Sequence, residues 1–475
     1  MTRAKLIHNA AMKIMGDIGV RIHNDKALEI FKANGIKTEG NTAFFTEEQV
    51  MHWVNMAPGS FTLYGRNPKY NMTIGDGSVN PAPSYGCAFI DSWEGKRRRG
   101  TLQDYIKCLK LVHAEDIYSI NGGIMVQPSD IPEKFGSIGM FYATLLYSDK
   151  AMIMPTGSKT EMELMLEAGC EVFGGKEEMI KKPRTITLIN TNSPLSLDNK
   201  MLDCLMLLAE YGQAVIVCPA AMLGATGSLS MAGTLASGTA ESLAGIVLAQ
   251  MIRPGAPVVF GVQSTAVDMK GMTFACAAPE GTLMQGFSVS MAEFYGIPSR
   301  GGGCQTDATL INCQAGYESM LTFSQAYRHG INFVMEAGGV MHSVNATSFE
   351  KMIVDFEIIR QVKAAYTPIE VTEETLNLDE IKEMGHDGSF ITSEYTLFNY
   401  GDLYSPKIGD RNASDPDYFK KSIDKEMNRL LQEYDSNPPE LDRETREKVK
   451  SVLARSGLEM RYFENIEDNS SAGEQ

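Results

Sequence analysis

Short apolar runs alternate with longer amphipathic stretches over most of the chain, beginning near residue 84. In the long stretches apolar residues recur every three to four positions, which predicts helices, while the short runs predict buried strands. The predicted strands are Gly86–Asp91, Tyr118–Val126, Ala151–Thr156, Thr185–Asn190, Ala214–Val217, Val258–Val262, Ser299–Gly303 and Asn332–Ala337. The predicted helices are Leu102–Ala114, Phe135–Leu146, Thr160–Phe173, Lys200–Tyr211, Glu241–Ile252, Gly281–Tyr295, Ala315–His329 and Phe349–Lys363.

Eight strand–helix units in succession predict an α/β protein whose strands are parallel, because each helix returns the chain to the same edge of the sheet. Eight such units closing on themselves form a (β/α)8 TIM barrel, which we place over residues 76–367. The competing fold is a doubly wound open sheet. That fold usually has a glycine-rich phosphate turn after its first strand, and the sequence shows none there.

The two ends of the chain have a different pattern. Residues 1–75 predict a small helical N-terminal subdomain, whose third helix opens at the capping box Thr46-Glu47-Glu48-Gln49. Residues 368–475 predict a helical C-terminal extension with polar linkers. Its last stretch, Asn465–Gln475, is acidic and composed of small residues, which is typical of a disordered tail.

Composition and charge narrow the function. A formal net charge of -16 argues against nucleic acid or an anionic membrane as a partner, since both select basic surfaces. The eight cysteines form no CxxC pair and indicate a reduced protein. The start, Met1–Lys5, lacks the apolar core of a signal peptide, and no run of 18 apolar residues occurs, so we expect a cytoplasmic protein.

A barrel confines its chemistry to the carboxyl ends of its strands and the loops that follow. The polar and aromatic candidates at these positions are Tyr85, Phe89, Asn190, Gln263, Gln305, Thr306, Asp307, Glu336 and His342. Glu336 follows the apolar run Phe333–Met335, where a carboxylate is costly unless it meets a cation or a hydrogen-bond donor. His342 comes three residues after a double glycine, and a lone histidine is more often a structural residue than a functional one.

Two glycine-rich stretches have alternative interpretations. Ala221–Ala240 precedes the predicted helix at Glu241–Ile252 and could cradle an anion through backbone N–H groups, but it lacks the Lys-Ser/Thr of a P-loop. Gly301-Gly302-Gly303 permits close approach by a ligand or by a neighbouring strand. Small residues around a barrel mouth leave a wide opening, which suits a bulky partner.

Several segments resemble the trimethylamine methyltransferase superfamily. They are Gly224–Gly227 (GATG), Ala240–Gly261 (AESLAGIVLAQMIRPGAPVVFG), Ala278–Glu280 (APE), Tyr295–Arg300 (YGIPSR), and Asp307 followed by Gln314–Glu318 (QAGYE). The resemblance implies a (β/α)8 barrel that passes a methyl group from an amine to the cobalt(I) centre of a separate corrinoid protein. Only standard residues occur, so the chain resembles the branch without pyrrolysine, whose substrates are quaternary amines such as glycine betaine, proline betaine, carnitine and γ-butyrobetaine.

This resemblance implies roles for the candidates. No tightly bound cofactor is expected, because the corrinoid belongs to the partner protein, and a homo-oligomer is usual for such barrels. Glu336, His342 and Asp307 are the expected catalytic residues. A quaternary ammonium is held by aromatic faces and negative charge, which Tyr85 or Phe89 and Glu336 would supply. His342, Gln305 or Asn190 would bind a substrate carboxylate, and Gln263, Thr306 and Asp307 would complete the cavity.

Two other functions remain open. A zinc-dependent corrinoid methyltransferase of the methanol or thiol type would need a His/Cys/Glu ligand set at the strand ends. Cys304 and His342 could contribute to such a set, but the sequence offers no convincing third ligand. A non-catalytic betaine-binding protein would hold the same ligand without any transfer of its methyl group.

Overall fold

The central body of the molecule is a closed barrel of eight parallel strands, so the predicted fold class is confirmed. The computed structural model describes residues 1–468. The barrel strands are β6 (Asn80–Pro81), β9 (Ile120–Gly122), β10 (Ala151–Ile153), β11 (Thr185–Asn190), β13 (Ala214–Cys218), β15 (Val258–Phe260), β18 (Arg300–Gly302) and β19 (Phe333–Met335). Strands β9 to β15 pair in chain order, and β18, β19 and β6 pair likewise.

Two junctions close the barrel. A parallel bridge between Phe260 and Ser299 joins β15 to β18. On the other side, the chain after β6 meets the chain after β9, where Gly86 N donates to Ile124 O at 2.7 Å and Gln127 N to Cys87 O at 2.8 Å. With both junctions made, no strand of the described barrel is left as an edge.

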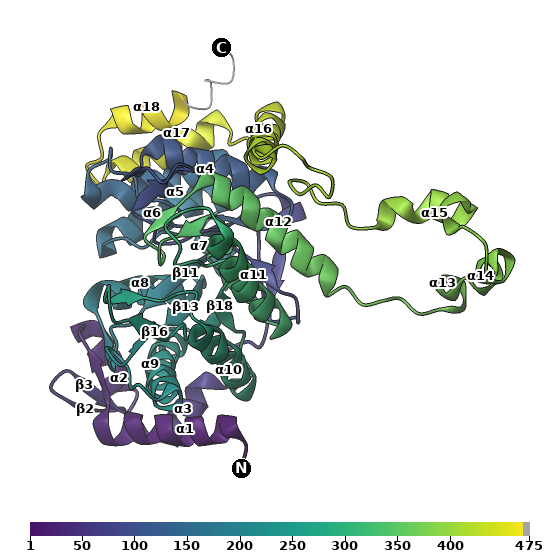
Figure 1. Cartoon of the computed structure of the whole chain (residues 1–475). Coiled ribbons are helices and arrows are strands. Elements are labelled where there is room, and N and C mark those ends of the chain that lie inside the picture. Colours follow the sequence, from purple (N-terminus) through teal and green to yellow (C-terminus); the bar gives the residue numbers. More distant parts are fainter. Residues whose placement is uncertain (469–475) are drawn as a thin grey trace.

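Long helices surround the strands (Figure 1), and each barrel strand is followed by one of them along the chain. They are α4 (Leu102–Ala114), α5 (Gly136–Tyr147), α6 (Lys159–Phe173), α8 (Asn199–Glu210), α9 (Met231–Ile252), α10 (Pro279–Tyr295), α11 (Cys313–Arg328) and α12 (Phe349–Ala365), with the short α7 (Lys176–Lys181) after α6. Side-chain caps start most of them, for example Thr101 on Asp104 N and Ser158 on Glu161 N.

The prediction was wrong about the first barrel strand. The strand is Asn80–Pro81, whereas Phe89–Asp91 forms β7, which pairs antiparallel with β8 (Arg97–Arg99) in a hairpin. On one side, Asn80 N donates to Asn332 O, directly before β19, and Ala82 N donates to Val334 O in β19. The residues that alternate with them, Pro81 and Pro83, have no N–H to offer the other neighbour. The two prolines interrupt the apolar run that marks the other barrel strands in the sequence. The first strand was therefore missed.

The glycine-rich stretch before residue 241 also differs from the prediction, because half of it is helical. Helix α9 begins at Met231, capped by Ser230, and therefore includes Gly233 and Gly238. The helix packs closely on the barrel wall, and a Cβ on Gly245 would lie only 2.8 Å from Val217 Cγ1. Within the stretch itself, a Cβ on Gly238 would lie 3.2 Å from Val262 Cγ1, so small residues on this face serve close helix–strand packing.

The N-terminal segment contains the three predicted helices and, in addition, short strands. The helices are α1 (Arg3–Lys13), α2 (Asp25–Ala33) and α3 (Glu47–Val54), and the strands are β1 (Val20–Ile22), β2 (Lys37–Glu39), β3 (Thr42–Phe44), β4 (Phe61–Leu63) and β5 (Met72–Ile74). Helices α1 and α3 pack on α9. Leu63, Met72 and Ile74 of the β4–β5 hairpin pack against residues inside the barrel and fill one end of it.

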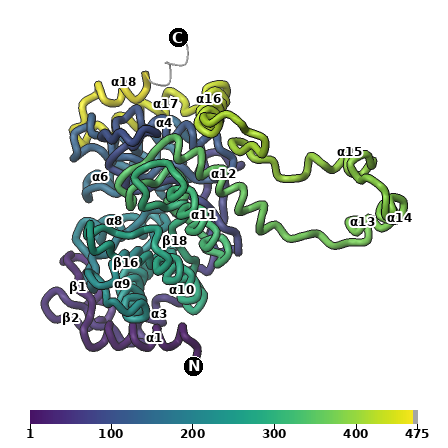
Figure 2. Tube along the Cα trace, in the orientation of Figure 1, coloured from purple at the N-terminus to yellow at the C-terminus, as the bar shows by residue number. Residues whose placement is uncertain are grey.

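The C-terminal segment first leaves the body and then returns to it (Figures 1 and 2). Its outer part carries α13 (Glu373–Leu376), α14 (Leu378–Met384) and α15 (Glu394–Asn399), and its inner part carries α16 (Tyr418–Ser436), α17 (Arg443–Ala454) and α18 (Met460–Asp468). Helix α18 includes Asn465–Asp468, so that part of the predicted disordered tail is helical; residues 469–475 lie outside the described residues. The boundaries at residues 75 and 367 stay a prediction.

One described helix, α9, is long and apolar enough to cross a membrane by length and composition. In this fold 83% of its most apolar window is buried, as is usual for the core helix of a barrel. The remaining short strands, β12 (Ser196–Leu197), β14 (Met222–Leu223), β16 (Thr265–Asp268), β17 (Thr273–Phe274), β20 (Val340–Met341) and β21 (Ala346–Thr347), lie in the loops after the barrel strands. These loops form the mouth.

Candidate active site at the barrel mouth

The alternation of side chains along the strands shows which residues face the inside of the barrel. Ile186 and Leu188 of β11 belong to the apolar cluster inside the barrel, so Asn190, two residues further, lies on the same face. Asn190 is exposed to solvent and is in register with Cys218, the last residue of β13. The inside of the barrel is therefore apolar in its depth and open to water at the carboxyl ends of the strands.

A buried ion pair lies at this end of the barrel. Arg300 of β18 donates from Nη2 to Glu336 Oε1 and from Nη1 to Cys218 Sγ at 3.4 Å. Arg300 is 2% exposed and Glu336 is 4% exposed. Glu336 directly follows β19 and has a left-handed φ of 54°, which turns its side chain away from the strand alternation. The cation that a buried carboxylate at position 336 was expected to need is thus Arg300. The sequence alone had not identified Arg300 as a site residue.

Burial and charge act in opposite directions on this pair. Burial raises the pKa of Glu336, while the guanidinium of Arg300 and the side-chain amide of Gln263 oppose that rise. Burial disfavours the charged form of Arg300, but the Glu336 carboxylate and Cys218 together outweigh it and raise the arginine pKa. Burial also raises the pKa of Cys218, so the sulfur beside Arg300 is a thiol. Each charge is retained because the other is present.

Several polar atoms at the mouth have no hydrogen-bond partner within the described part of the chain. They are Gln263 Oε1, both polar side-chain atoms of Gln305, Arg300 Nε and Glu336 Oε2. Buried polar groups in native proteins are almost always paired, and unpaired ones call for a ligand or an ordered water. Three of these four residues, namely Gln263, Gln305 and Glu336, were predicted from the sequence.

Gln305 and Tyr85 lie inside the barrel as well. Arg300 faces the interior, so Gly302 does too, and a Cβ on Gly302 would lie 2.6 Å from Gln305 Nε2. The Gln305 amide therefore occupies the space that a side chain at position 302 would fill. Tyr85 belongs to the interior apolar cluster, and burial raises the pKa of its hydroxyl. Its ring lies against Gly123, where a Cβ would be 2.9 Å from Tyr85 Cδ2.

Thr306 and Asp307 hold the loop after β18. Thr306 Oγ1 donates to Glu318 Oε2 at 2.5 Å. Asp307 accepts from Cys276 N at 3.0 Å and from Ser343 Oγ at 2.8 Å, which joins the loops after β15 and β19. Their polar atoms are engaged within the protein, so the structure places these two predicted residues around the site and not among its unpaired groups.

His342 and Phe89 form a separate group with the β7–β8 hairpin. Arg97 Nη2 donates to His342 Nδ1 at 2.7 Å, and Arg97 also forms a two-bond ion pair with Asp91, at 2.6 and 2.8 Å. The Phe89 ring lies 5.2 Å from the Arg97 guanidinium. Burial and the charge of Arg97 lower the pKa of His342, so its ring is neutral at neutral pH. The contacts of this group are with Arg97 and Asp91, not with Arg300 and Glu336.

The loop after β19 has an unusual backbone. His342, Ser343 and Val344 have φ values of 51°, 55° and 70°. Successive left-handed residues other than glycine are uncommon, and for a β-branched residue such as Val344 the conformation is a genuine outlier. Strain of this kind persists only where surrounding contacts impose it, and it is concentrated at functional sites. Here the contacts from Arg97 and Asp307 impose it.

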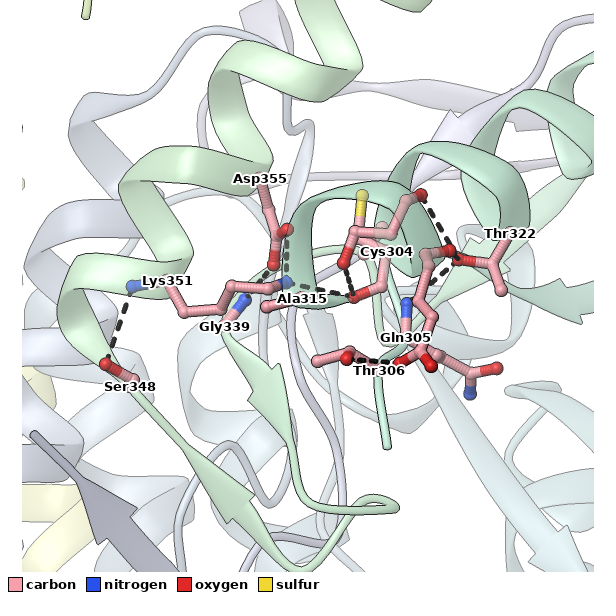
Figure 3. A network of polar contacts seen from close by, with 12 residues as sticks. Cys304, Gln305, Thr306, Ala315, Thr322, Gly339, Ser348, Lys351 and Asp355 are labelled. Atoms are coloured by element: carbon pink, nitrogen blue, oxygen red, sulfur yellow. Dashed lines mark hydrogen bonds and ion pairs between the residues drawn. The ribbon is translucent and has the colours of Figure 1, made fainter. Parts of the chain in front are cut away.

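A second buried ion pair supports the site from behind (Figure 3). Lys351 and Asp355 of α12 are fully buried and bonded to each other. Lys351 Nζ also donates to Cys304 O at 3.3 Å, and Asp355 Oδ2 accepts from Gly339 N at 2.7 Å. Burial raises the pKa of Asp355 to about 6. The pair thereby ties α12 to the loop before Gln305 and to the loop after Glu336.

Glu241 of α9 supports the loop after β11 in the same way. It is 1% exposed and accepts from the hydroxyls of Thr191 and Ser193. Leu195 N donates to its other oxygen at 2.8 Å. The sequence did not identify four of these charged residues as belonging to the site. All four lie within predicted helices or strands, where their charge was the only sign of a special role: Glu241, Lys351, Asp355 and Arg300. The Ser193 hydroxyl thus helps to hold the loop after β11 through its bond to Glu241.

Within residues 1–468, no group of three or more His, Cys, Asp or Glu side chains could hold a metal ion. Cys304, one of the two candidates for a zinc site, is fully buried and its thiol pKa is raised well above its usual value by burial. The other, His342, accepts a hydrogen bond from Arg97.

The sequence matches a family model and several characterised proteins. The model "Trimethylamine methyltransferase (MTTB)" matches residues 2–460. A glycine betaine methyltransferase of Desulfitobacterium hafniense is 38% identical over 461 residues, covering 96% of each chain. A proline betaine:corrinoid methyltransferase of Eubacterium limosum is 27% identical over 422 residues, covering 87% of each chain.

Similarity extends to archaeal proteins as well. A trimethylamine methyltransferase of Methanosarcina mazei is 31% identical over 409 residues, covering 83% of this chain and 82% of that protein. Among solved structures, the monomethylamine methyltransferase of Methanosarcina barkeri aligns over 91% of this chain and 92% of its own, with 12% identity and a TM-score of 0.46.

Proposed function

Because the chain belongs to the trimethylamine methyltransferase family, whose model spans residues 2–460, we propose that it demethylates a quaternary amine of the betaine type. The methyl acceptor is the cobalt(I) of a corrinoid held by a separate protein. Membership of the family makes the chain a methyltransferase. The betaine substrate is supported by two relatives whose names specify glycine betaine and proline betaine.

The chemistry needs little from the protein beyond position and shelter. The cobalt(I) electron pair attacks the methyl carbon, the C–N bond breaks, and its electrons stay on nitrogen as the lone pair of a neutral tertiary amine. No proton has to move, so no general acid is required. The protein contributes by holding the methyl group in line with cobalt and by excluding water from the reacting atoms.

The observation that carries this proposal is the unpaired oxygen of a buried carboxylate at the mouth, Glu336 Oε2. A quaternary ammonium has no N–H, so it is held by charge and by aromatic faces. Glu336 supplies the charge, and the ring of Tyr85 lies inside the same end of the barrel. Asn190, Gln263 and Gln305 line the remainder, and Thr306, Asp307, His342 and Phe89 position the surrounding loops.

The test uses purified protein, free cobalt(I) corrinoid and one amine at a time, namely glycine betaine, proline betaine, carnitine, γ-butyrobetaine or trimethylamine. The visible spectrum reports the change from cobalt(I) to methyl-cobalt(III). Conversion with a betaine and not with trimethylamine supports the proposal. Absence of conversion with every amine, using corrinoid shown to be reduced and open to methylation by methyl iodide, contradicts it.

The partner, location and assembly are part of the same proposal. We expect a cognate corrinoid protein to meet the mouth, a cytoplasmic location, and association of the chain with itself. Light scattering on the eluting protein measures its mass against the 52.1 kDa of one chain, and a monomer at micromolar concentration contradicts the predicted homo-oligomer.

A further inference from the structure

Each residue of the Arg300–Glu336 ion pair has one polar atom that forms no hydrogen bond. Arg300 Nη2 and Glu336 Oε1 bond to each other, while Arg300 Nε and Glu336 Oε2 have no hydrogen-bond partner in the described chain. Both residues keep a small water-accessible surface, 2% for Arg300 and 4% for Glu336, and neighbouring Gln263 keeps 5%. The two unpaired atoms are themselves buried from bulk water, so each has lost its hydration without gaining a protein partner among the described residues.

We propose that Arg300 and Glu336 act together as a receptor for a zwitterion, in which Arg300 binds the substrate carboxylate and Glu336 faces the ammonium. This inference rests on the proposed function and deepens it, because it assigns the carboxylate to Arg300. The sequence had suggested His342, Gln305 or Asn190 for that role. Arg300 is thus a specificity-determining residue, and Glu336 contacts the group that reacts.

Net charge is the first argument for this assignment. One guanidinium and one carboxylate sum to zero, and a betaine also sums to zero, so the buried complex stays neutral. A cation without a carboxylate leaves a net positive charge in the same buried space, and an anion without an ammonium leaves a negative one. Uncompensated buried charge is strongly unfavourable. The alternation of four charges also pairs every positive group with negative neighbours.

The position of the unused atoms is the second argument. Arg300 is in register with Phe333, three residues before Glu336, so its backbone lies about 10 Å deeper in the barrel at roughly 3.3 Å per residue. Its Nη2, at the tip of the side chain, reaches Glu336, whereas Nε lies nearer its own backbone. A carboxylate on Nε is therefore deeper than an ammonium on Glu336 Oε2. The N-methyl groups then face the mouth, where the methyl acceptor arrives.

The experiment measures binding by titration calorimetry without any corrinoid, so it does not depend on turnover. Three ligands of similar shape separate the charges. Glycine betaine has both, choline has the ammonium without the carboxylate, and 3,3-dimethylbutanoate has the carboxylate with carbon in place of nitrogen. The variants are Arg300→Met and Glu336→Gln. Arg455→Gln, which breaks an exposed Arg–Glu pair with Glu167, is the matched control.

The wild-type protein and the control are expected to bind glycine betaine about 10- to 100-fold more tightly than either analogue, the usual value of a charged hydrogen bond. Arg300→Met is expected to bring the betaine-to-choline ratio within about threefold of one. Glu336→Gln is expected to do the same for the ratio of betaine to 3,3-dimethylbutanoate. Each ratio is measured within one variant, so a partly unfolded sample does not change it.

If Arg300→Met leaves the preference for betaine over choline unchanged, the assignment is wrong. The double variant Arg300→Met/Glu336→Gln, which removes both buried charges together, is made if a single variant does not fold; it is expected to lose both preferences, and retention of either overturns the proposal. The cobalt(I) assay on the wild-type protein distinguishes failure of this receptor assignment from failure of the proposed function. Methyl transfer from a betaine with unchanged ratios refutes only the receptor, whereas no transfer from any betaine refutes the function.

Discussion

Two buried ion pairs lie within one region of the barrel, and they differ in how completely they are bonded. Lys351 and Asp355 are each 0% exposed, and neither leaves a polar side-chain atom unpaired in the described structure. Arg300 and Glu336 are nearly as buried but leave Nε and Oε2 unpaired. Burial alone thus does not distinguish a structural pair from a binding pair. The unpaired atoms do, because a fold that needed only the pair would have satisfied them.

The backbone around the two pairs differs in the same sense. Lys351 and Asp355 lie four residues apart on the regular helix α12. Glu336 has a left-handed φ and is followed by the left-handed residues His342, Ser343 and Val344. The residue with the unpaired oxygen, Glu336, is thus itself held in an uncommon backbone conformation, as expected of a site that is held ready for a ligand, whereas Lys351 and Asp355 have regular helical backbone.

The largest effect on stability is expected from Lys351→Met. This change leaves the Asp355 carboxylate buried without its cation, and removing one partner of a buried pair costs about 3–5 kcal/mol. Denaturant unfolding monitored by circular dichroism gives the free energy. The double variant Lys351→Met/Asp355→Leu removes both charges and is expected to recover most of the loss. A change below 1 kcal/mol in the single variant would show that the pair is not structural.

Glu336→Gln is expected to have the largest effect on catalysis. The substitution keeps the shape of the side chain and removes the charge that faces the ammonium, so we expect turnover with a betaine to fall by about 100-fold, as for loss of one preorganised electrostatic group. The rate of cobalt(I) methylation measures it, with Arg455→Gln as the control. Stability should fall less than in Lys351→Met, since the amide still accepts a bond from Arg300. An unchanged rate would remove Glu336 from the site.

The Lys351–Asp355 pair also predicts a pH dependence of stability. Burial raises the pKa of Asp355 from 3.8 to about 6, so the folded state takes up its proton more readily than the unfolded chain does. The contribution of this group is therefore fully present below about pH 4 and is lost as the pH rises through 6. The difference in unfolding free energy between the wild type and Asp355→Asn should decrease over that range and level off above it. A difference that grows with pH would contradict the direction of the shift.

The smallest effect is expected at His342. Its ring accepts a hydrogen bond from Arg97 outside the Arg300–Glu336 pair, so His342→Gln should lower turnover by less than about 10-fold through the loop it holds. Because the pKa of His342 is lowered, its ring is already neutral at neutral pH, and the variant should keep the wild-type pH profile between 6.5 and 8. A lost inflection in that range would assign His342 a proton that this structure does not require.

Much of the fold follows from local patterns. Helix α4 begins at Leu102 and ends at Ala114, and β11 spans Thr185–Asn190, as the hydrophobic spacing predicts. Gln263, Gln305 and Glu336 were predicted because a polar side chain after an apolar strand needs an explanation, and all three carry unpaired atoms at the mouth. Local signals suffice where period, caps and composition agree.

What the sequence determined by itself is therefore the succession of eight strand–helix units, and with it the barrel and the end at which its chemistry lies. Tertiary structure alone decided that Asn80–Pro81 is the first strand, because its pairing with β19 is made more than 250 residues away in the chain. It alone decided that Arg300 meets Glu336, since the register of β18 against β19 sets which side chains share the interior. Periodicity is a property of neighbours along the chain, whereas charge pairing across a barrel depends on register, which no local pattern encodes.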